Sequence, residues 1–415
     1  MTPETPPASL TAERVALEKC HDSQAECPNC GGQGLEIFYQ LARIPVHSCL
    51  LVDQRTAALE FPTHDLRLGY CRRCGFITNT VFDPTVHNYS QQYEETQGFS
   101  PTFSRFARSL AQRLVEQHHL RGKTVLEIGC GKGEFLVLLC ELGAARGIGI
   151  DPSYIPERTR SQAAARIEFI RDFYGPQYAH LTADFVCCRH TLEHIAPTGE
   201  FVRALRASLD GRPETVVFFE LPETLRILRE GAFWDIYYEH CSYFTPGSLA
   251  RLFRAAGFDV SALELAYDDQ YILLTATPAP QPTAARLELE DDLQATHQAL
   301  ADFARRCGER LARWRSYLSQ AADEGRRVVL WGSGSKAVAF LTTLGVRDEI
   351  EYVVDINPHK HGCYLPVSGQ RIVGPEFLRE YRPDAVIVMN PIYCDEIGAM
   401  LGELGLRVEL LSVND

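Results

Sequence analysis

Long apolar runs are missing from this chain of 415 residues. No stretch approaches the roughly 20 consecutive apolar residues that cross a bilayer, so we expect no membrane span. The residues from Met1 to Pro7 also lack the basic and apolar regions of a secretory signal. From these two absences we expect a cytoplasmic protein.

Basic residues are also scarce. Lysine and arginine number 41 against 54 aspartates and glutamates, which leaves a net charge of −13. This balance argues against unspecific binding to nucleic acid or to anionic membranes, because both need a basic surface. A local basic pocket for a phosphorylated small molecule is compatible with it. The apolar content of 45% excludes disorder of the whole chain, and the length predicts two to four domains.

Cysteine, in contrast, is abundant, with 14 residues. In a long cytoplasmic chain these cysteines are not a disulfide framework. Four of them form two pairs with the spacing Cys-x-x-Cys, each pair followed by glycine, at Cys27, Cys30, Cys71 and Cys74. Two such pairs complete a tetrahedral site of four thiolates, so we predict structural zinc. Free core cysteines or an iron centre are the alternatives. Because four thiolates leave no open position, we do not expect this metal to catalyse the reaction.

Alternating strand and helix patterns predict an α/β protein with parallel, doubly wound sheets. Strands are expected at 124–128, 146–150, 167–170, 185–188 and 215–220, and again at 328–331, 352–354, 385–389 and 408–411. Prolines at 278, 280 and 282 mark a linker before a long helical stretch. We therefore predict a polar tail over 1–25, a zinc-binding domain over 26–90, an α/β domain over 91–277, a linker with a long helix over 278–325, and a second α/β domain over 326–415.

A glycine-rich turn follows the first strand of the central domain. The strand ends near Glu127, and Gly129, Gly131 and Gly133 lead into a helix, while Asp151 closes the next strand. A glycine turn by itself would also suit a dinucleotide. Glu127, however, would repel a pyrophosphate. A cofactor with an amino-acid tail and no phosphates fits better, with Asp151 placed for the two hydroxyls of a ribose.

This stretch resembles the first motif of the class I S-adenosylmethionine-dependent methyltransferases. The resemblance implies that Asp151 binds the ribose and that Asp172 and Phe173 flank the adenine. It also places Arg189 and His190 in a loop beside the cofactor, together with His194. Asp172 as a surface acid and His194 as a packing residue at a helix start are the simpler interpretations.

The segment 233–245 is dense in aromatic, acidic and imidazole groups, and it follows the fifth strand of the central domain. Loops beyond strand ends in such sheets are where substrates bind. His240 has the ordinary pKa of a useful base, about 6.5. Tyr237 or Tyr238 can donate a hydrogen bond to a developing enolate, and Glu239 can orient the imidazole or stabilise its charge. An aromatic patch around a core histidine is the alternative.

The chain as a whole resembles one family, the sugar C-methyltransferases that act on nucleotide-linked 4-keto-deoxysugars. The resemblance covers residues 26–415 and rests on the four cysteines, the glycine turn, and the motif Tyr-x-Glu-His before Ser-Tyr-Phe. It implies a Rossmann-like methyltransferase core, a small zinc domain and a second, Rossmann-like C-terminal domain that covers the substrate. It further implies that His240 removes a proton α to a ketone, while Tyr237 and Glu239 hold the substrate.

One segment departs from the family. Its members often carry an aromatic-rich Ser-Ser segment after the zinc domain. This chain keeps Tyr93 and Ser100, which we assign to the substrate, but adds Glu94 and Glu95. We interpret the two acids as the surface start of a helix. The departure affects the assignment of a sugar-nucleotide substrate more than the assignment of methyl transfer as the reaction.

In the C-terminal domain, the strand at 328–331 leads into a Gly/Ser turn and a helix. Backbone amides at a helix N-terminus together with one ammonium group form an anion site. The resemblance places Ser333, Ser335 and Lys336 near a diphosphate, and we assign Asn390 to the substrate as well. A Rossmann turn without a ligand is the alternative, and a dinucleotide site would use Asp355 but lacks the third glycine.

We therefore predict an S-adenosylmethionine-dependent C-methyltransferase that acts on a small keto compound, with a nucleotide-linked 4-keto-deoxysugar as the expected substrate. O- or N-methylation of another metabolite is the nearest alternative. A nicotinamide-dependent oxidoreductase or a nucleotide-binding protein is the alternative from a different class.

Overall fold

An antiparallel sheet of six strands opens the computed structural model, which describes residues 15–86, 89–281, 283 and 285–415. Its order is β1-β3-β4-β5-β11, and β2 also pairs with β3. The strands are β1 (Val15–Ala16), β2 (Cys20–Glu26), β3 (Gln33–Pro45), β4 (Thr63–Tyr70), β5 (Ile77–Asn79) and β11 (Ser242–Tyr243). A short helix, α1 (Arg55–Leu59), connects β3 to β4.

The predicted polar tail is wrong for residues 15–25, because β1 and β2 both pair with β3. The side chains of β2 are mostly exposed, so its sequence has the polarity of a tail. Hydrogen bonds between backbones hold it in the sheet, and these do not depend on apolar side chains. The rest of the predicted tail, residues 1–14, and the linker residue Pro282 lie outside the described residues.

The central domain is built on a sheet of seven strands in the order β12-β13-β10-β9-β6-β7-β8. Its strands are β6 (Thr124–Ile128), β7 (Arg146–Ile150), β8 (Ile167–Ile170), β9 (Phe185–Arg189), β10 (Val216–Pro222), β12 (Phe258–Ala266) and β13 (Tyr271–Pro278). Its helices are α2 (Pro101–Gln117), α3 (Glu134–Glu141), α4 (Thr198–Ser208), α5 (Thr224–Glu230) and α6 (Pro246–Ala255).

The first five strands of this sheet are parallel, as expected, and they match the predicted positions closely. The antiparallel hairpin of β12 and β13 was not predicted. Its turn uses three consecutive non-glycine residues at positive φ, from Tyr267 to Asp269. Such a turn carries no glycine or proline signal in the sequence.

The C-terminal domain holds a parallel sheet of five strands in the order β16-β15-β14-β17-β18. Its strands are β14 (Val328–Trp331), β15 (Ile350–Val354), β16 (Arg371–Val373), β17 (Ala385–Val388) and β18 (Glu409–Ser412), and its helices are α8 (Ser335–Leu344), α9 (Leu378–Tyr381) and α10 (Cys394–Glu403). The fold class expected from the sequence, a Rossmann-like α/β core with a second α/β domain, is confirmed.

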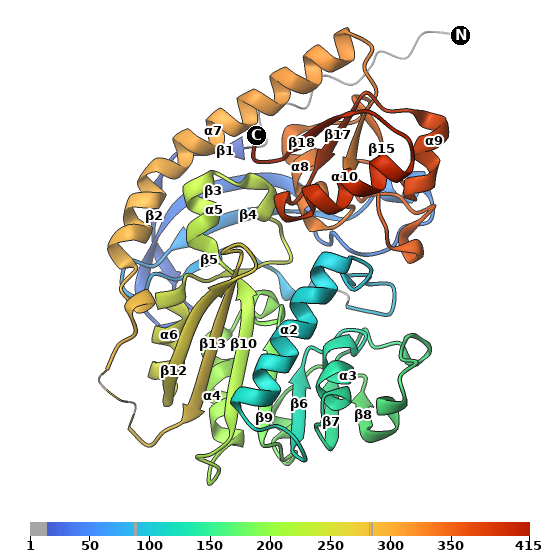
Figure 1. Ribbon diagram of the computed structural model, residues 1–415. Coiled ribbons are helices and arrows are strands. Elements are labelled where there is room, and N and C mark those ends of the chain that lie inside the picture. The colour runs from blue at the N-terminus through green and yellow to red at the C-terminus, as the bar shows by residue number, and fades with distance from the viewer. Residues whose placement is uncertain (1–14, 87–88, 282, 284) are drawn as a thin grey trace.

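The long helix α7 (Leu293–Asp323) joins the N-terminal sheet to the C-terminal domain (Figure 1). One face of it is buried in a single apolar core that extends from Phe38 of β3 through Trp314 to Phe340 of α8. The predicted helical stretch is therefore an internal packing element. None of the helices in the described part of the chain has the length and apolarity to cross a membrane.

Candidate active site

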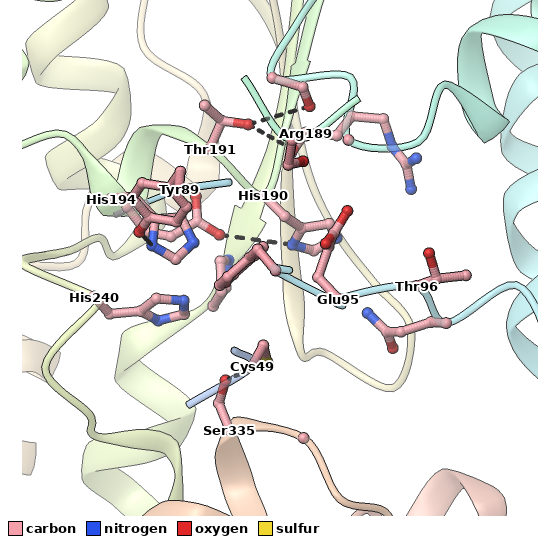
Figure 2. Close-up of a pocket in the computed structure, with 18 of the residues that line it drawn as sticks. Cys49, Tyr89, Glu95, Thr96, Arg189, His190, Thr191, His194, His240 and Ser335 are labelled. Carbon is pink, nitrogen blue, oxygen red and sulfur yellow. Dashed lines mark hydrogen bonds and ion pairs between the residues drawn. The ribbon is translucent and has the colours of Figure 1, made fainter. Parts of the chain in front are cut away.

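A cavity of about 1010 Å³ lies where the three domains meet. It is lined by the loops that follow β6, β7, β8 and β9, by the segment before β11, and by the start of α8 (Figure 2). Most of the residues predicted from the sequence line it: Tyr93, Ser100, Glu127, Gly129, Gly131, Asp151, Asp172, Phe173, Arg189, His190, Tyr237, His240, Ser335, Lys336 and Asn390. Three do not: Gly133, Glu239 and Ser333.

The glycine turn after β6 shapes one wall of the cavity. Gly129 has φ of 69°, and a Cβ atom there would collide with the side chain of Thr191. Only glycine satisfies both constraints. Gly133 does not reach the cavity and instead occupies the N-cap position of α3, with φ of 83°.

Glu127 is a buried acid in that wall, and its Oε2 has no hydrogen-bond partner among the described residues. Burial raises the pKa of Glu127 to about 8, although the charge of Arg189 opposes the shift. An unpaired buried carboxyl oxygen is costly unless a ligand supplies a donor. The α-ammonium group of S-adenosylmethionine carries N–H donors of the kind that such an oxygen would accept from.

Arg189 and His190 share one buried acid, Glu220. Arg189 Nε donates to Glu220 Oε2 at 2.5 Å, and His190 Nε2 lies 3.1 Å from Glu220 Oε1. Burial disfavours the imidazolium, yet Glu193 and Glu220 together raise the pKa of His190 to about 9. His190 is therefore cationic at neutral pH and is not available as a base.

Asp151 and Asp172 stand at the ends of β7 and β8. The Asp151 carboxylate accepts hydrogen bonds from Gly131 N at 2.8 Å and from Ser153 N and Oγ, both at 2.7 Å, so it also fixes the glycine turn. Hydrogen bonds from Tyr178 and from the backbone of Phe173 lower the pKa of Asp172. The ring of Phe173 is 60% exposed at the cavity, as a surface that packs on a ligand would be.

His240 and Tyr237 lie together in the cavity wall, with His240 Nε2 and the Tyr237 hydroxyl 3.1 Å apart. Burial lowers the pKa of His240 well below its usual value, and the charges of His194, His190 and Lys336 act in the same direction. The imidazole is therefore neutral at physiological pH and keeps a lone pair. The segment is held in place because β11 pairs with β5 of the N-terminal sheet.

Glu239 is placed differently from our expectation. Its side chain is fully buried on the far side of the segment, where Oε1 lies 2.8 Å from His47 Nδ1 and Oε2 accepts from Ser48 N at 2.9 Å. Glu239 lies in the turn that precedes His240, and this turn directs its carboxylate to His47 and Ser48 while His240 lines the cavity. The carbonyl oxygen of Glu239 lies 3.0 Å from His194 Nδ1.

The segment before α2 also corrects one interpretation. Glu94 is not at a surface helix start, because it is buried, pairs with Arg158 at 2.8 Å and accepts from Asn357 Nδ2 at 2.9 Å. It thereby ties the central domain to the C-terminal one.

Burial raises the pKa of Glu95 to about 7, although the charge of Lys132 opposes the shift. Ser100, the N-cap of α2, donates to Glu396 Oε2 at 2.9 Å.

At the start of α8, Ser335 and Lys336 face the cavity, and Lys336 Nζ lies 2.9 Å from Asp235 Oδ1. Asn390 exchanges two hydrogen bonds with Gln270, at 2.9 and 3.0 Å.

Ser333 does not face the cavity. Its backbone N–H and its hydroxyl both donate to Asp355 Oδ2. The Asp355 carboxylate, which would meet a ribose in a dinucleotide site, is therefore engaged by its own chain.

Several residues of the site had no signal in the sequence. His47 approaches Glu239 across 192 positions of the chain, and Gln270 comes from the hairpin that was not predicted. Glu193 and Glu220 lie in predicted elements, but only the tertiary structure brings their carboxylates to His190. Their charges decide the protonation state of the site.

The four cysteines form one cluster, in which all Sγ atoms lie within 4.8 Å of one another. Cys27 Sγ is 3.6 Å from Cys74 Sγ, and Cys30 Sγ is 3.7 Å from Cys71 Sγ. A tetrahedron with zinc–sulfur bonds of about 2.3 Å has edges of about 3.8 Å, so the cluster has the size of a zinc site. In each pair, the amide of the following glycine donates to the carbonyl of the first cysteine, at 2.8 and 2.9 Å.

Two protein families match the chain in sequence. The family described as a methyltransferase domain matches residues 102–263, and the C-methyltransferase C-terminal domain matches residues 275–405. C-methyltransferase NovU from Streptomyces niveus is 28% identical over 390 residues, which cover 90% of this chain and 91% of that protein. The ubiquinone biosynthesis O-methyltransferase from Neisseria meningitidis serogroup C (strain 053442) is 31% identical over 159 residues, or 34% of this chain and 66% of that protein.

Solved methyltransferases also resemble the chain. The 1,6-didemethyltoxoflavin-N1-methyltransferase from Burkholderia thailandensis is 22% identical with a TM-score of 0.33, and the match covers 42% of this chain and 78% of that one. The magnesium protoporphyrin IX methyltransferase from Synechocystis PCC 6803 is 18% identical with a TM-score of 0.33, and the match covers 43% of this chain and 84% of that one. The two family matches together cover both α/β domains, and they favour methyl transfer over the oxidoreductase alternative. The chain therefore combines a methyltransferase domain with a C-methyltransferase C-terminal domain and is an S-adenosylmethionine-dependent methyltransferase.

Proposed function

We propose that the protein methylates a carbon atom next to the ketone of a small molecule, and that this molecule is a nucleotide-linked 4-keto-deoxysugar. The observation that carries the proposal is the pair of His240 and Tyr237, which lines the same cavity as the glycine turn and Asp151. A base thus stands beside the expected cofactor site.

Methylation of carbon needs this base, because an unactivated C–H bond has no electron pair to offer. S-adenosylmethionine, when bound, supplies an electrophilic methyl group. The neutral imidazole of His240 accepts the proton α to the ketone, and the electron pair of that C–H bond moves into the enolate. Tyr237, 3.1 Å from His240 Nε2, can turn its hydroxyl to the enolate oxygen. The enolate carbon would then take the methyl group, with the sulfur–methyl bond breaking and its electron pair remaining on the sulfur of S-adenosylhomocysteine, the leaving group. His240 returns its proton to solvent.

A phosphorylated substrate is supported by the start of α8. Its first residues, Ser335 and Lys336, line the cavity, and the N-terminus of a helix favours anions. Burial lowers the pKa of Lys336, but Asp235 stabilises its charge. A diphosphate at this place would leave the sugar on the side of His240. The resemblance to sugar C-methyltransferases points to the same substrate class.

We also propose that the four-cysteine cluster holds a structural Zn²⁺ ion. Its sulfur–sulfur distances fit a closed tetrathiolate site, and Arg251 Nε donates to the carbonyl oxygen of Cys74 at 2.9 Å. The metal would thus fix the turns that join the N-terminal sheet to α6.

The test is the variant His240→Asn with a panel of nucleotide-linked 4-keto-deoxysugars. We expect unchanged affinity for S-adenosylmethionine and a loss of turnover of about 10²–10⁴-fold or more, because the general base is removed. With S-adenosylhomocysteine in deuterated water, the wild type should exchange the α-proton and the variant should not. NMR of the product should place the new methyl group on carbon.

Near-normal turnover of His240→Asn would show that another group is the base. Methylation of oxygen or nitrogen in the product, without proton exchange, would refute the keto substrate.

A further inference from the structure

Glu193, His194 and His240 bring one carboxylate and two imidazoles together in the wall of the cavity. One ligand atom of each lies within 4.8 Å of the other two, and all three residues line the cavity. Glu193 and His194 belong to the short 3-10 helix η5 (Leu192–His194), whereas His240 precedes β11. Figure 2 shows the two imidazoles close together, and their ring centroids are 4.8 Å apart. Within the described residues, the four-cysteine cluster is the other group of this kind.

Glu193 carries a free oxygen in this cluster. The residue is 2% exposed, and its Oε2 has no hydrogen-bond partner in the part of the chain that the structure describes. The other carboxylate oxygen of Glu193, Oε1, lies 3.7 Å from His190 Nδ1. Leaving a buried carboxylate oxygen unpaired costs free energy, and a bound cation would remove that cost.

His194 is oriented as metal ligands are. Its Nδ1 lies 3.0 Å from the carbonyl oxygen of Glu239 and 2.9 Å from the hydroxyl of Tyr89. Because the carbonyl oxygen can only accept, this geometry favours the tautomer with the proton on Nδ1 and the lone pair on Nε2, and the Tyr89 hydroxyl then accepts from the same N–H. Metal-binding histidines typically donate their second ring N–H to a backbone carbonyl or a carboxylate in this way. Arg189 and His190 share Glu220, and His190 also lies 3.7 Å from Glu193, so two carboxylates stand against these two positive charges. A metal ion on Glu193 would therefore compete with His190 for that carboxylate.

We propose that Glu193, His194 and His240 form a second metal site, which binds one Zn²⁺ ion or a similar divalent transition-metal ion. Two imidazoles and one carboxylate are a common zinc donor set, and three protein ligands leave a position open to the cavity. The site is separate from the four-cysteine cluster in its residues and in its nitrogen and oxygen chemistry.

The metal site and the base exclude each other. A cation at this site occupies a lone pair of His240, and the same imidazole must be free to accept the α-proton. Binding of the cation therefore inhibits methyl transfer reversibly. This consequence, unlike the metal binding itself, rests on the function proposed above for His240.

The binding test uses the full chain with zinc in its four-cysteine cluster, titrated with Co²⁺. We expect one further equivalent of cobalt, with visible d–d absorption and without a thiolate-to-cobalt charge-transfer band. Glu193→Gln and His194→Asn should each weaken this binding by at least about tenfold, since each removes one ligand. His297→Asn is the matched control, because His297 is an exposed histidine of α7.

No cobalt uptake beyond the cysteine cluster would overturn the metal site. So would uptake that is the same in Glu193→Gln and His194→Asn as in the wild type, because exposed histidines would then be the ligands. The zinc content and circular dichroism of each variant report whether it is folded. Glu193→Gln keeps the shape of the side chain, so the test survives if His194→Asn does not fold.

The inhibition test adds Zn²⁺ to the wild type during turnover of its keto substrate, with a chelator to reverse the effect. Turnover should fall as zinc rises, and chelation should restore it, equally in His297→Asn. If cobalt binds but zinc leaves turnover unchanged, the inhibitory role is wrong. If no keto compound is methylated at all, the proposed function fails while the cobalt titration still decides the metal site.

Discussion

At the scale of the residue, Glu127 is the buried acid whose charge depends on the ligand. Without a cofactor its pKa is about 8, so at pH 7 about one molecule in ten carries the carboxylate. A cationic ligand favours the ionised form and lowers this pKa. Binding of such a ligand therefore releases a proton from Glu127 at neutral pH, and the affinity for the ligand rises with pH up to about 8.

We therefore predict that the affinity for S-adenosylmethionine rises by up to about tenfold per pH unit below pH 8 and is level above it. Calorimetry in buffers of different ionisation enthalpy should detect the release of close to one proton at pH 7. Glu127→Gln should bind more weakly at pH 8 and lose the proton release. Binding by the wild type without proton release would remove Glu127 from the amino-acid end of the cofactor.

Asp151 is the second residue that we assign to the cofactor. In Asp151→Ala the two expected hydrogen bonds to the ribose are lost, each worth about 1.5–3 kcal/mol when charged. Because about 1.4 kcal/mol corresponds to one decade, affinity for S-adenosylmethionine should fall at least tenfold. Asp151→Asn is the comparison variant, since its single amide oxygen can keep one of the two bonds from Gly131 N and Ser153 N, and it should lose less than Asp151→Ala. An unchanged dissociation constant in Asp151→Ala would contradict the assignment.

At the scale of the element, the two cysteine turns connect the N-terminal sheet to the catalytic segment. Cys71 and Cys74 lie between β4 and β5, and β5 pairs with β11. One residue, Cys241, separates His240 from the start of β11. The packing of Phe76 on Phe244, with ring centroids 4.9 Å apart, strengthens the same junction. A metal in the cluster would thus support the active site without touching it.

We predict that Cys71→Ser lowers the zinc content to less than about half an equivalent and lowers the melting temperature, because three thiolates do not close the site. Cys20→Ser is the control, since Cys20 is exposed on β2 and outside the cluster. Metal analysis and calorimetry of both variants, purified without chelator, provide the check. Less than half an equivalent of any metal in the wild type would refute the zinc site.

At the scale of the whole molecule, the domains share one apolar core. Phe340 of α8 is fully buried, stacks on Phe233 of the central domain with centroids 5.9 Å apart, and meets Trp314 of α7 edge-on at 5.4 Å. The C-terminal domain is therefore not an appendage that unfolds alone. Its removal would expose apolar side chains of both neighbours.

We predict that Phe340→Ala destabilises the protein by about 3–5 kcal/mol, the usual cost of truncating a buried phenylalanine. The N-terminal sheet and the C-terminal domain should unfold together, in one calorimetric transition at a lower temperature. Phe99→Ala is the control, because this ring is 39% exposed. Two separate transitions in the variant, with only one shifted, would show that the two parts do not share a core.

The elements whose signals are local could be predicted from the amino-acid sequence. The parallel strands were predicted from runs of apolar residues, and the cysteine turns were predicted from their spacing. The glycine turn was predicted from three glycines at alternate positions, and all three have a positive φ in the structure. These patterns depend on neighbours within a few residues, so periodicity and residue type are enough to predict them. The positions of Glu127, Asp151 and His240 in one cavity follow from the same local rules, because loops at the carboxyl ends of parallel strands share one edge of the sheet.

Which groups face each other across the domains depends on the folded arrangement and could not be predicted from the sequence. Glu239 contacts His47 and does not face the cavity. Glu94 forms a buried ion pair with Arg158. Glu193 lies close to His194 and His240. Burial and charge at these contacts set the pKa values of the site, and both depend on side chains that are distant in the chain. The sequence therefore predicts which residues reach the cavity, whereas packing between the domains decides what each of them can do there.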